Sequence, residues 1–353
     1  MPLKGYSVLK GRPVDNRLAT GASPHYQILV SAAGELHRVA VNVRSADGSE
    51  VEFLVRSHLE HPLTEGLADL AEGLHRLPSR PGGLALDFIR ANIAQPWEFT
   101  PLPLSAAGPD NDLNEKLDAS VRRAMSDERA MLCAFGVRWG PEAEADRYFG
   151  FRPGRGVHDV HFNQGNPPGP YAADNGPWQD GGLILQFPDV AGGAGQWVGI
   201  FLKFRSQAWH SDDRTGDLVL PPDPDHPGRP HGPIARDRIP PLGVPDGLVR
   251  IVAACVNDRR TPERETVTLL NTADVPVDLT GWSIRDKQKN AMVLPGTVIA
   301  PGATLLVVMR PPVTLSNQGG LITLADARGI KVHGVSYTRA QARQPGRTIP
   351  FQD

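Results

Sequence analysis

The sequence predicts an α+β N-terminal domain followed by a C-terminal β-sandwich. Its 353 residues exceed what one ordinary hydrophobic core requires, so two or more domains are expected. The 37 glycines and 34 prolines favour turns and strands over long helices. Residues 217–246 are rich in Pro, Asp, Gly and His, which is typical of a linker. This stretch divides the chain into a domain of residues 1–240 and a second domain of residues 248–353.

The N-terminal region combines strand patterns with two helical patterns. Alternating apolar and polar residues predict strands over 25–30, 38–43 and 51–55. Apolar runs predict buried strands over 183–187 and 197–204, and 131–139 and 148–152 are further strand candidates. Ala33-Gly34 is expected to form a turn, and Asp47-Gly48 predicts a hairpin. Leucines at helical spacing predict a helix over 62–77 that Gly66 and Gly73 weaken. The best helical pattern covers 112–134, with Asp110 or Asn111 as its N-cap.

The region from Leu248 onward changes character. Short strands are predicted over 267–271, 277–284, 298–309 and 321–324, with turns between them. Their regular spacing favours a β-sandwich of about 100 residues. The segments Glu265–Asn271, Leu279-Thr280-Gly281-Trp282 and Pro301-Gly302 resemble the lamin-tail domain, an immunoglobulin-like sandwich. The resemblance implies a targeting or binding accessory and not a catalyst.

Composition excludes several classes of protein. The formal net charge of −2 excludes a broadly basic nucleic-acid binder, although a local basic groove stays open. Cys133 and Cys255 fall in different domains and are expected to be buried thiols without a disulfide or a cysteine zinc site. No run of about 18 apolar residues predicts a membrane span, and Met1–Lys10 lacks a signal-peptide core. A cytoplasmic location is the default expectation. Export by a pathway that does not require an N-terminal signal is the alternative.

One polar segment stands out, residues 154–166, which read Gly-Arg-Gly-Val-His-Asp-Val-His-Phe-Asn-Gln-Gly-Asn. Glycine lets a backbone approach a ligand closely, but a purely structural loop has no need of two histidines. A polar turn with incidental histidines is the alternative. This segment, together with Pro2–Tyr6, Gln179–Gly182 and Gln207–Asp212, is similar to the YukJ-like family, a bacterial family of unknown function. The resemblance covers the first 240 residues and implies no activity.

The two halves of the N-terminal region contain similar short motifs. The first contains His25-Tyr26-Gln27 and, 17 residues after His25, Asn42. The second contains His161-Phe162-Asn163, followed later by Gln207. This pattern resembles the phospholipase D superfamily, in which each half carries His-x-Lys and a downstream Asn. Here Gln27 and Asn163 stand where that family has lysine.

The phospholipase D resemblance implies an α/β domain of two related halves and a mechanism without a cofactor. Of His25 and His161, one would attack a phosphodiester to form a phosphohistidine and the other would protonate the leaving oxygen. The amides of Gln27, Asn42, Asn163 and Gln207 complete the predicted catalytic set. Phosphoryl oxygens also need positive charge and donors. The predicted substrate-binding residues are Arg44, Lys203, Arg205 and Asn166.

Two other functions remain open from the sequence. A divalent metal such as Zn²⁺, Mn²⁺ or Mg²⁺ would activate water for hydrolysis, with ligands drawn from His158, His161, Asp180, His210 and Asp212. Alternatively, the polar cluster binds nucleic acid or another partner without catalysis. The preferred prediction is hydrolysis of a phosphodiester in nucleic acid, so nucleic acid is the expected partner. The sequence does not define the oligomeric state.

Overall fold

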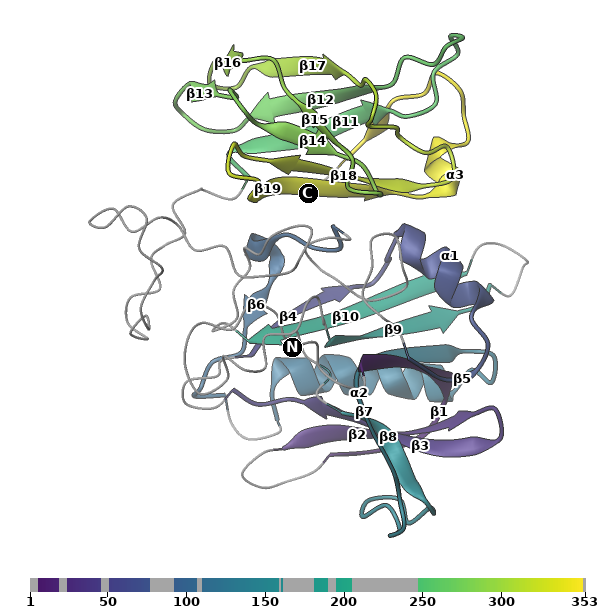
Figure 1. Ribbon diagram of the computed structural model, residues 1–353. Coiled ribbons are helices and arrows are strands. Elements are labelled where there is room, and N and C mark those ends of the chain that lie inside the picture. Colours follow the sequence, from purple (N-terminus) through teal and green to yellow (C-terminus); the bar gives the residue numbers. More distant parts are fainter. Residues whose placement is uncertain are drawn as a thin grey trace.

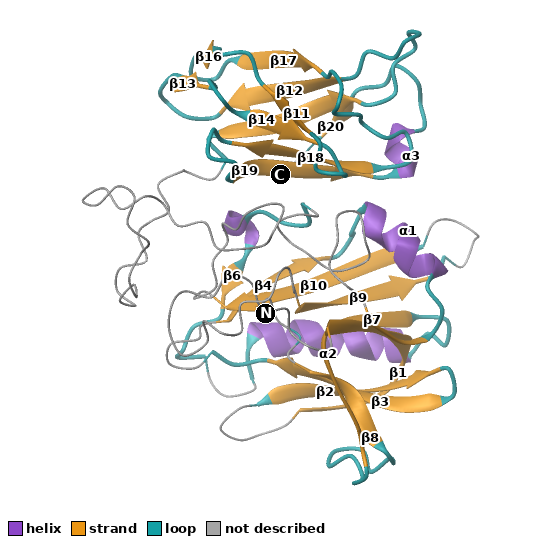
Figure 2. Ribbon diagram, in the orientation of Figure 1, coloured by secondary structure: helices purple, strands orange, loops and turns teal. Residues whose placement is uncertain are grey.

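The computed structural model describes residues 6–18, 24–45, 51–76, 92–106, 110–158, 160, 181–189, 195–204 and 247–351. These residues form an N-terminal and a C-terminal domain (Figure 1). Strands dominate both domains (Figure 2). The expected linker over 217–246 lies outside the described residues.

The N-terminal domain contains ten strands and two α-helices within its described residues. The strands are β1 (Tyr6–Leu18), β2 (His25–Ala32), β3 (Glu35–Asn42), β4 (Val51–Arg56), β5 (Gly73–Arg76), β6 (Thr100–Pro101), β7 (Met131–Glu142), β8 (Gly154–His158), β9 (Gly181–Phe187) and β10 (Gln196–Phe204). The helices are α1 (Pro62–Asp69) and α2 (Asp112–Met125), with a 3-10 turn at Pro96–Glu98.

The expected α+β class, with an α/β N-terminal domain of two related halves, is wrong, because strands dominate the described residues. The ten strands form one sheet in the order β5-β1-β2-β3-β8-β7-β9-β10-β4-β6, and β1 also pairs with β7. Strands from the two halves interleave, because β8 lies beside β3 and β4 lies beside β10. A phospholipase D-like architecture requires each half to form its own unit, and this topology does not provide that. The similarity between the two sequence halves therefore does not reflect a structural repeat.

The sheet bends back on itself because β1 and β7 each pair with different neighbours along their length. Residues 6–11 of β1 pair with β7, whereas residues 12–18 pair with β2. In β7, residues 131–135 pair with β9 and residues 137–142 pair with β8. The two parts of the sheet thus enclose a space, and α2 lies within it (Figure 1).

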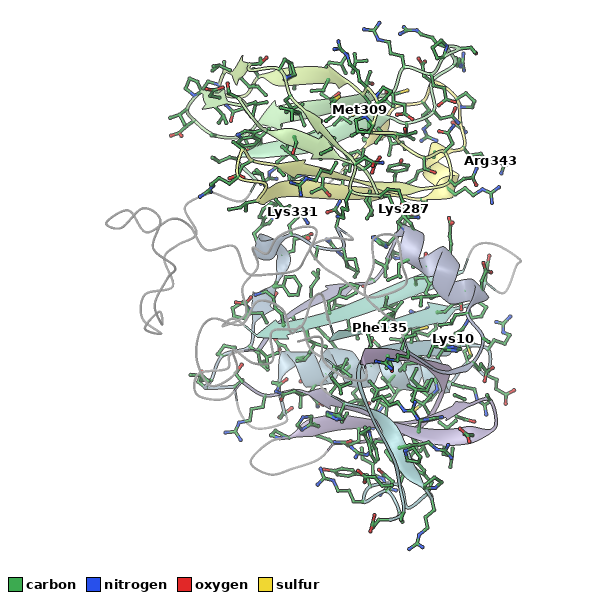
Figure 3. The ribbon with its side chains drawn as sticks, in the orientation of Figure 1. Lys10, Phe135, Lys287, Met309, Lys331 and Arg343 are labelled. Atoms are coloured by element: carbon green, nitrogen blue, oxygen red, sulfur yellow. The ribbon has the colours of Figure 1, made fainter. Side chains whose placement is uncertain are left out.

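Helix α1 covers the opposite side of the β9–β10 part of the sheet. It ends at Asp69 and not at residue 77, because the chain turns into strand β5 at Gly73, where φ is +126°. Lys10, labelled in Figure 3, is buried and donates to the carbonyl oxygens of Leu67 at 2.7 Å, Ala68 at 2.9 Å and Leu70 at 2.7 Å. A lysine that caps helix-end carbonyls complements the negative end of the helix dipole.

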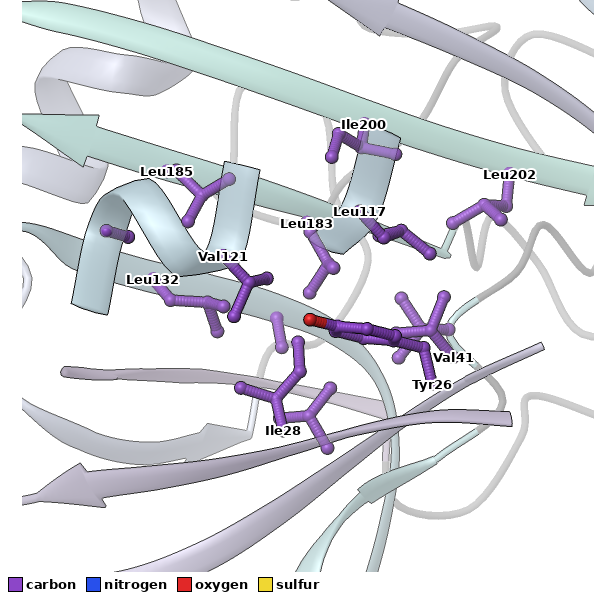
Figure 4. Close-up of a cluster of buried hydrophobic side chains, with 14 of the residues drawn as sticks. Tyr26, Ile28, Val41, Leu117, Val121, Leu132, Leu183, Leu185, Ile200 and Leu202 are labelled. Carbon is purple, nitrogen blue, oxygen red and sulfur yellow. The ribbon is translucent and has the colours of Figure 1, made fainter. Parts of the chain in front are cut away.

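Helix α2 supplies the centre of the main core. Its buried face, Leu113, Leu117, Val121 and Ala124, packs against both parts of the sheet (Figure 4). Asn111 is the N-cap, as predicted, and its side chain accepts from the Asn114 amide at 2.9 Å. The helix ends at Met125, so its predicted extension to 134 is wrong, since residues from Met131 onward form β7.

Tyr26 joins the β2 strand to α2. Its hydroxyl donates to Asp118 Oδ1 at 2.8 Å and accepts from Asn16 Nδ2 at 2.6 Å. Burial and the neighbouring Asp118 carboxylate raise the pKa of the Tyr26 phenol well above its usual value. The phenol therefore stays protonated and acts as a structural donor.

Other local expectations had mixed outcomes. Ala33 and Gly34 have φ of 50° and 82° and join β2 to β3, which confirms that turn. The hairpin predicted at Asp47-Gly48 is wrong, because β3 pairs with β2 and β8 while β4 pairs with β10 and β6. The strand predicted over 148–152 is wrong, because these residues form a turn followed by irregular structure. Cys133 and Cys255 are free, but only Cys133 is buried as expected, since Cys255 is half-buried. Burial raises the pKa of the Cys133 thiol to about 12.

The C-terminal domain is a β-sandwich, as predicted. One sheet has the order β17-β12-β11-β20 and the other β15-β14-β18-β19, with a separate β13–β16 pair. The strands are β11 (Val249–Cys255), β12 (Thr266–Asn271), β13 (Val277–Asp278), β14 (Ser283–Arg285), β15 (Ala291–Val293), β16 (Val298–Ile299), β17 (Thr304–Val308), β18 (Gly320–Ala325), β19 (Lys331–Tyr337) and β20 (Ile349–Pro350); the short helix α3 spans Arg339–Ala342. The two sheets enclose a core of their own.

Residues 92–97 connect the two domains through hydrogen bonds. Asn92 is buried, and its amide nitrogen donates to the carbonyl oxygens of Ile322 at 3.1 Å and Val335 at 3.0 Å. Gln95 donates to the carbonyl oxygen of Gly334 at 2.6 Å. These bonds join the N-terminal domain to strands β18 and β19. Within the described residues, no helix is long and apolar enough to cross a membrane.

Candidate functional site

Two of the predicted site residues meet at one end of the β2–β3 hairpin. The register pairs His25, the first residue of β2, directly with Asn42, the last residue of β3. Strand side chains alternate between faces, and Tyr26 and Val41 belong to the core around α2. His25 and Asn42 therefore lie on the opposite face, away from α2.

Strand β8 brings His158 to the same edge of the sheet. It runs parallel to β3, with Arg38 paired to Gly156 and Val39 paired to Val157. One residue further along, His158 lies beside Ala40. Val157 is fully buried in the core, so His158 also faces away from α2. One edge of the sheet is thus the place where β3 and β8 end and β2 begins.

Arg44 lies immediately after this edge. Its backbone amide donates to Asn42 Oδ1 at 3.1 Å, which fixes the turn that leaves β3. Among the described residues, no carboxylate forms an ion pair with the Arg44 guanidinium. We call the set His25, Asn42, Arg44 and His158 the histidine edge.

Gln27 lies on the same face but has a structural partner. It is 1% exposed, and its Oε1 accepts from Arg38 Nη1 at 2.7 Å. Arg38 in turn forms an ion pair with the buried Asp146 at 2.6 Å. Its guanidinium also lies 4.7 Å from the Trp139 ring centroid and 5.0 Å from that of Tyr148. This geometry holds Gln27 within a structural cluster and leaves it little freedom to contact a substrate.

Sequence reasoning missed the Arg38 cluster. Arg38 and Asp146 are 108 residues apart, and no local motif links them. The turn that carries Asp146 has one local signal, since Asp146 Oδ1 accepts from the amides of Tyr148 at 3.0 Å and Phe149 at 2.9 Å. Such an Asx turn is a short-range pattern of an acid followed by a turn residue, here Gly150. That pattern identifies the turn but does not show that Asp146 pairs with Arg38.

Lys203 does not lie at the histidine edge. It belongs to β10, where it is buried and forms an ion pair with Glu52 on the neighbouring strand β4. Its ammonium also lies 5.4 Å from the centroid of the Phe99 ring. A lysine neutralised in this way supports the sheet, whereas Arg44 forms no ion pair within the described residues.

The remaining predicted site residues lie outside the described residues. They are His161, Asn163, Asn166, Asp180, Arg205, Gln207, His210 and Asp212. Of the predicted metal ligands, the structure therefore places only His158. The described part of the chain contains no group of three or more His, Cys, Asp or Glu side chains that could hold a metal ion.

The fold and the histidine edge define a strand-rich protein with a polar site at a sheet edge and a C-terminal β-sandwich. Residues 1–216 match the family described as "Uncharacterized conserved protein (DUF2278)", and residues 248–339 match the Lamin Tail Domain. The chain belongs to the first of these families. It is 37% identical to the uncharacterized protein YukJ of Bacillus subtilis (strain 168) over 217 residues, which cover 60% of this chain and 93% of that protein. No solved structure matches.

Proposed function

We propose that the N-terminal domain hydrolyses phosphodiesters in nucleic acid and that the histidine edge is its active site. The observation that carries the proposal is the register that places His25 opposite Asn42, with Arg44 two residues beyond and His158 at the end of the parallel neighbour. Imidazole is the side chain best suited to give and take protons near neutral pH. A guanidinium and an amide are suitable donors for phosphoryl oxygens.

The proposed mechanism uses acid–base catalysis and not a phosphohistidine. The phosphohistidine belongs to the phospholipase D resemblance, and the interleaved sheet lacks the two related halves which that mechanism needs. In the proposed reaction, one imidazole removes a proton from water as the water oxygen bonds to phosphorus. The bond from phosphorus to the leaving oxygen breaks, and a second imidazole protonates that oxygen.

The residues of the histidine edge have distinct roles in this proposal. His25 is one member of the acid–base pair. The other is His158, at the end of β8, or His161, three residues further along the chain. Asn42 and Arg44 donate to the phosphoryl oxygens as their negative charge grows, which lowers the energy of the transition state.

The test is cleavage of supercoiled plasmid and of single-stranded DNA by the full-length protein, with and without EDTA. The variants are His25→Ala, His158→Ala and His161→Ala. The control is His58→Ala, which removes an exposed histidine that follows strand β4 and does not belong to the edge. Loss of a general acid or base costs about 10²- to 10⁴-fold in rate. We expect that loss in His25→Ala and in one of the other two variants, with His58→Ala unchanged.

The outcomes separate the proposal from its alternatives. Cleavage that survives EDTA and fails in the histidine variants supports the acid–base mechanism. Cleavage that EDTA abolishes and Mn²⁺ or Mg²⁺ restores would overturn it and favour a metal site drawn from His158, His161, Asp180, His210 and Asp212. A homogeneous, folded protein that cleaves neither DNA would overturn the catalytic proposal and favour a binding module.

A further inference from the structure

The C-terminal domain carries an excess of positive charge. Residues 247–351 contain 13 Lys and Arg against 7 Asp and Glu, a net charge of +6, whereas the whole chain has a net charge of −2. The rest of the chain is therefore acidic. A charge difference of this size between two parts of one chain indicates that the basic part binds an anionic partner.

Much of this charge gathers at one end of the sandwich. The connection between β11 and β12 carries three exposed arginines, and the segment that begins with α3 carries three more: Arg259, Arg260, Arg264, Arg339, Arg343 and Arg347. The two segments lie side by side, since the Asn257 amide donates to the Ala342 carbonyl at 2.9 Å and Arg259 Nε donates to the Pro345 carbonyl at 3.0 Å. Figure 3 shows Arg343 at this end, beside α3.

A third segment adds to the same surface. The amide of Met309 donates to the carbonyl oxygen of Glu265 at 2.9 Å, which places the exposed Arg310 next to Arg264. Seven exposed arginines from three separate segments thus share one end of the domain. We call this set the arginine end.

Neighbouring acids do not neutralise the arginine end. Asp258 pairs with Arg260 at 3.8 Å and accepts from the backbone amides of Arg259 and Arg264. Glu263 contacts Asn317, and the buried Glu265 accepts from the Leu315 amide. Within the described residues, no ion pair joins a carboxylate to the other six arginines. An external anion is the natural partner for them.

We propose that the arginine end binds the phosphate backbone of nucleic acid. All seven cations are arginines, whose planar guanidinium forms paired hydrogen bonds to phosphate oxygens. They come from three segments, so they can contact several phosphates at once. Membrane-surface binding also needs apolar side chains that insert between lipids. Among the described residues, the exposed large apolar side chains are Leu36, Trp97, Leu104, Val275, Val293, Val298 and Leu306, and none belongs to these segments.

The experiment measures binding of a short labelled DNA duplex by fluorescence anisotropy over a series of salt concentrations. The full-length chain carries His25→Ala throughout, so that binding is measured without cleavage. The test variant adds Arg264→Gln, Arg310→Gln and Arg343→Gln, three exposed arginines from the three segments of the arginine end. The control adds Arg122→Gln, Arg129→Gln and Arg147→Gln, exposed arginines of the N-terminal domain, and removes the same charge.

The expected result is a weaker affinity in the test variant alone, by about tenfold or more. The slope of log affinity against log salt should also fall by about 0.9 for each phosphate that the variant no longer neutralises. An unchanged affinity and slope would overturn the proposal, and so would an equal weakening in the control. Tighter binding to anionic phospholipid vesicles than to DNA would overturn the nucleic-acid assignment. Because the surface lies in the other domain, either proposal can fail while the other stands.

Discussion

At the scale of single residues, some polar side chains on one face of the sheet have a structural role and others form the candidate site. Gln27 and His25 are two residues apart on β2, yet Gln27 is held by Arg38 while His25 lies at the strand edge beside Asn42. Arg38 is matched by the buried Asp146, whereas Arg44 has no ion pair within the described part of the chain. The Arg38 cluster stabilises the fold, and the residues of the histidine edge form the candidate site.

Replacing Arg38 with Ala should strongly destabilise the N-terminal domain. The Asp146 side chain is 0% exposed, so removal of Arg38 leaves a buried carboxylate without its partner. Breaking a buried pair in this way costs about 3–5 kcal/mol. Urea denaturation measures the loss of stability. Arg129→Ala is the control, because its pair with Asp127 is exposed at 3.5 Å and should contribute about 1 kcal/mol or less. Equal effects of the two substitutions would contradict this account of Arg38.

The sequence could predict part of the candidate site but not all of it. A supposed repeat pairs His25 with Asn42 in the sequence, but the two residues meet because a two-residue turn aligns β2 with β3. His158 reaches the same edge through a parallel pairing between β3 and β8, and pairing between distant strands leaves no local pattern. For the same reason the sequence predicted one substrate-binding role for both Lys203 and Arg44, although Lys203 on β10 forms an ion pair with Glu52.

At the scale of elements, several strand positions were predictable, but β1 was missed and the pairing of distant strands was not predictable. Alternation identified β2, β3 and β4, and apolar runs identified β9 and β10, all close to their observed bounds. The helical pattern over 112–134 overran into β7, because the apolar residues of a buried strand also fit a helical period. The false repeat had a different origin, since it depended on matching His-x-amide motifs in two halves whose strands interleave in one sheet.

Glu265, which contacts the loop between β17 and β18, should make the stability of the C-terminal domain depend on pH. Glu265, at the start of β12, accepts from the Leu315 amide of this loop at 2.9 Å. Burial raises the pKa of the Glu265 carboxyl from 4.5 to about 7. Between these pH values the folded protein holds a proton that the unfolded chain releases. The stability of the domain should therefore fall as the pH rises from 4.5 to 7.

Thermal unfolding at a series of pH values tests this expectation. The variant Glu265→Gln keeps the acceptor but cannot ionise, so its stability should change less across the window and should exceed that of the wild type above about pH 7. The control Asp274→Asn removes an exposed carboxylate of the same domain that does not contribute to the pKa of Glu265, and it should keep the wild-type dependence. A pH dependence that persists unchanged in Glu265→Gln would refute the assignment to this group.

At the scale of the whole molecule, the two domains have separate cores but share a buried polar contact. Asn92 donates to the carbonyl oxygens of Ile322 and Val335 in adjacent strands of the sandwich. Trp97 stacks on His333 with ring centroids 6.2 Å apart. The histidine edge and the arginine end belong to different domains, so this contact sets how the two surfaces are placed.

Replacing Asn92 with Ala should uncouple the two domains. Removal of the amide leaves buried carbonyl groups without their donor, at a cost of about 1–3 kcal/mol. Differential scanning calorimetry should show two transitions that lie further apart than in the wild type. Glu60→Ala removes an exposed hydrogen bond from Gln341 at the same boundary and should leave the transitions in place. Identical traces for wild type and Asn92→Ala would show that this contact does not couple the domains.

The most direct test of the histidine edge as one site is its response to a ligand that cannot be cleaved. Histidine side-chain NMR signals are assigned with His25→Gln and His158→Gln and followed while a short phosphorothioate oligonucleotide is added. The account predicts that the His25 and His158 signals shift together along one binding curve, and that Arg44→Ala weakens that curve while His58 stays unchanged. Shifts in neither histidine, or separate curves for the two, would contradict a shared site.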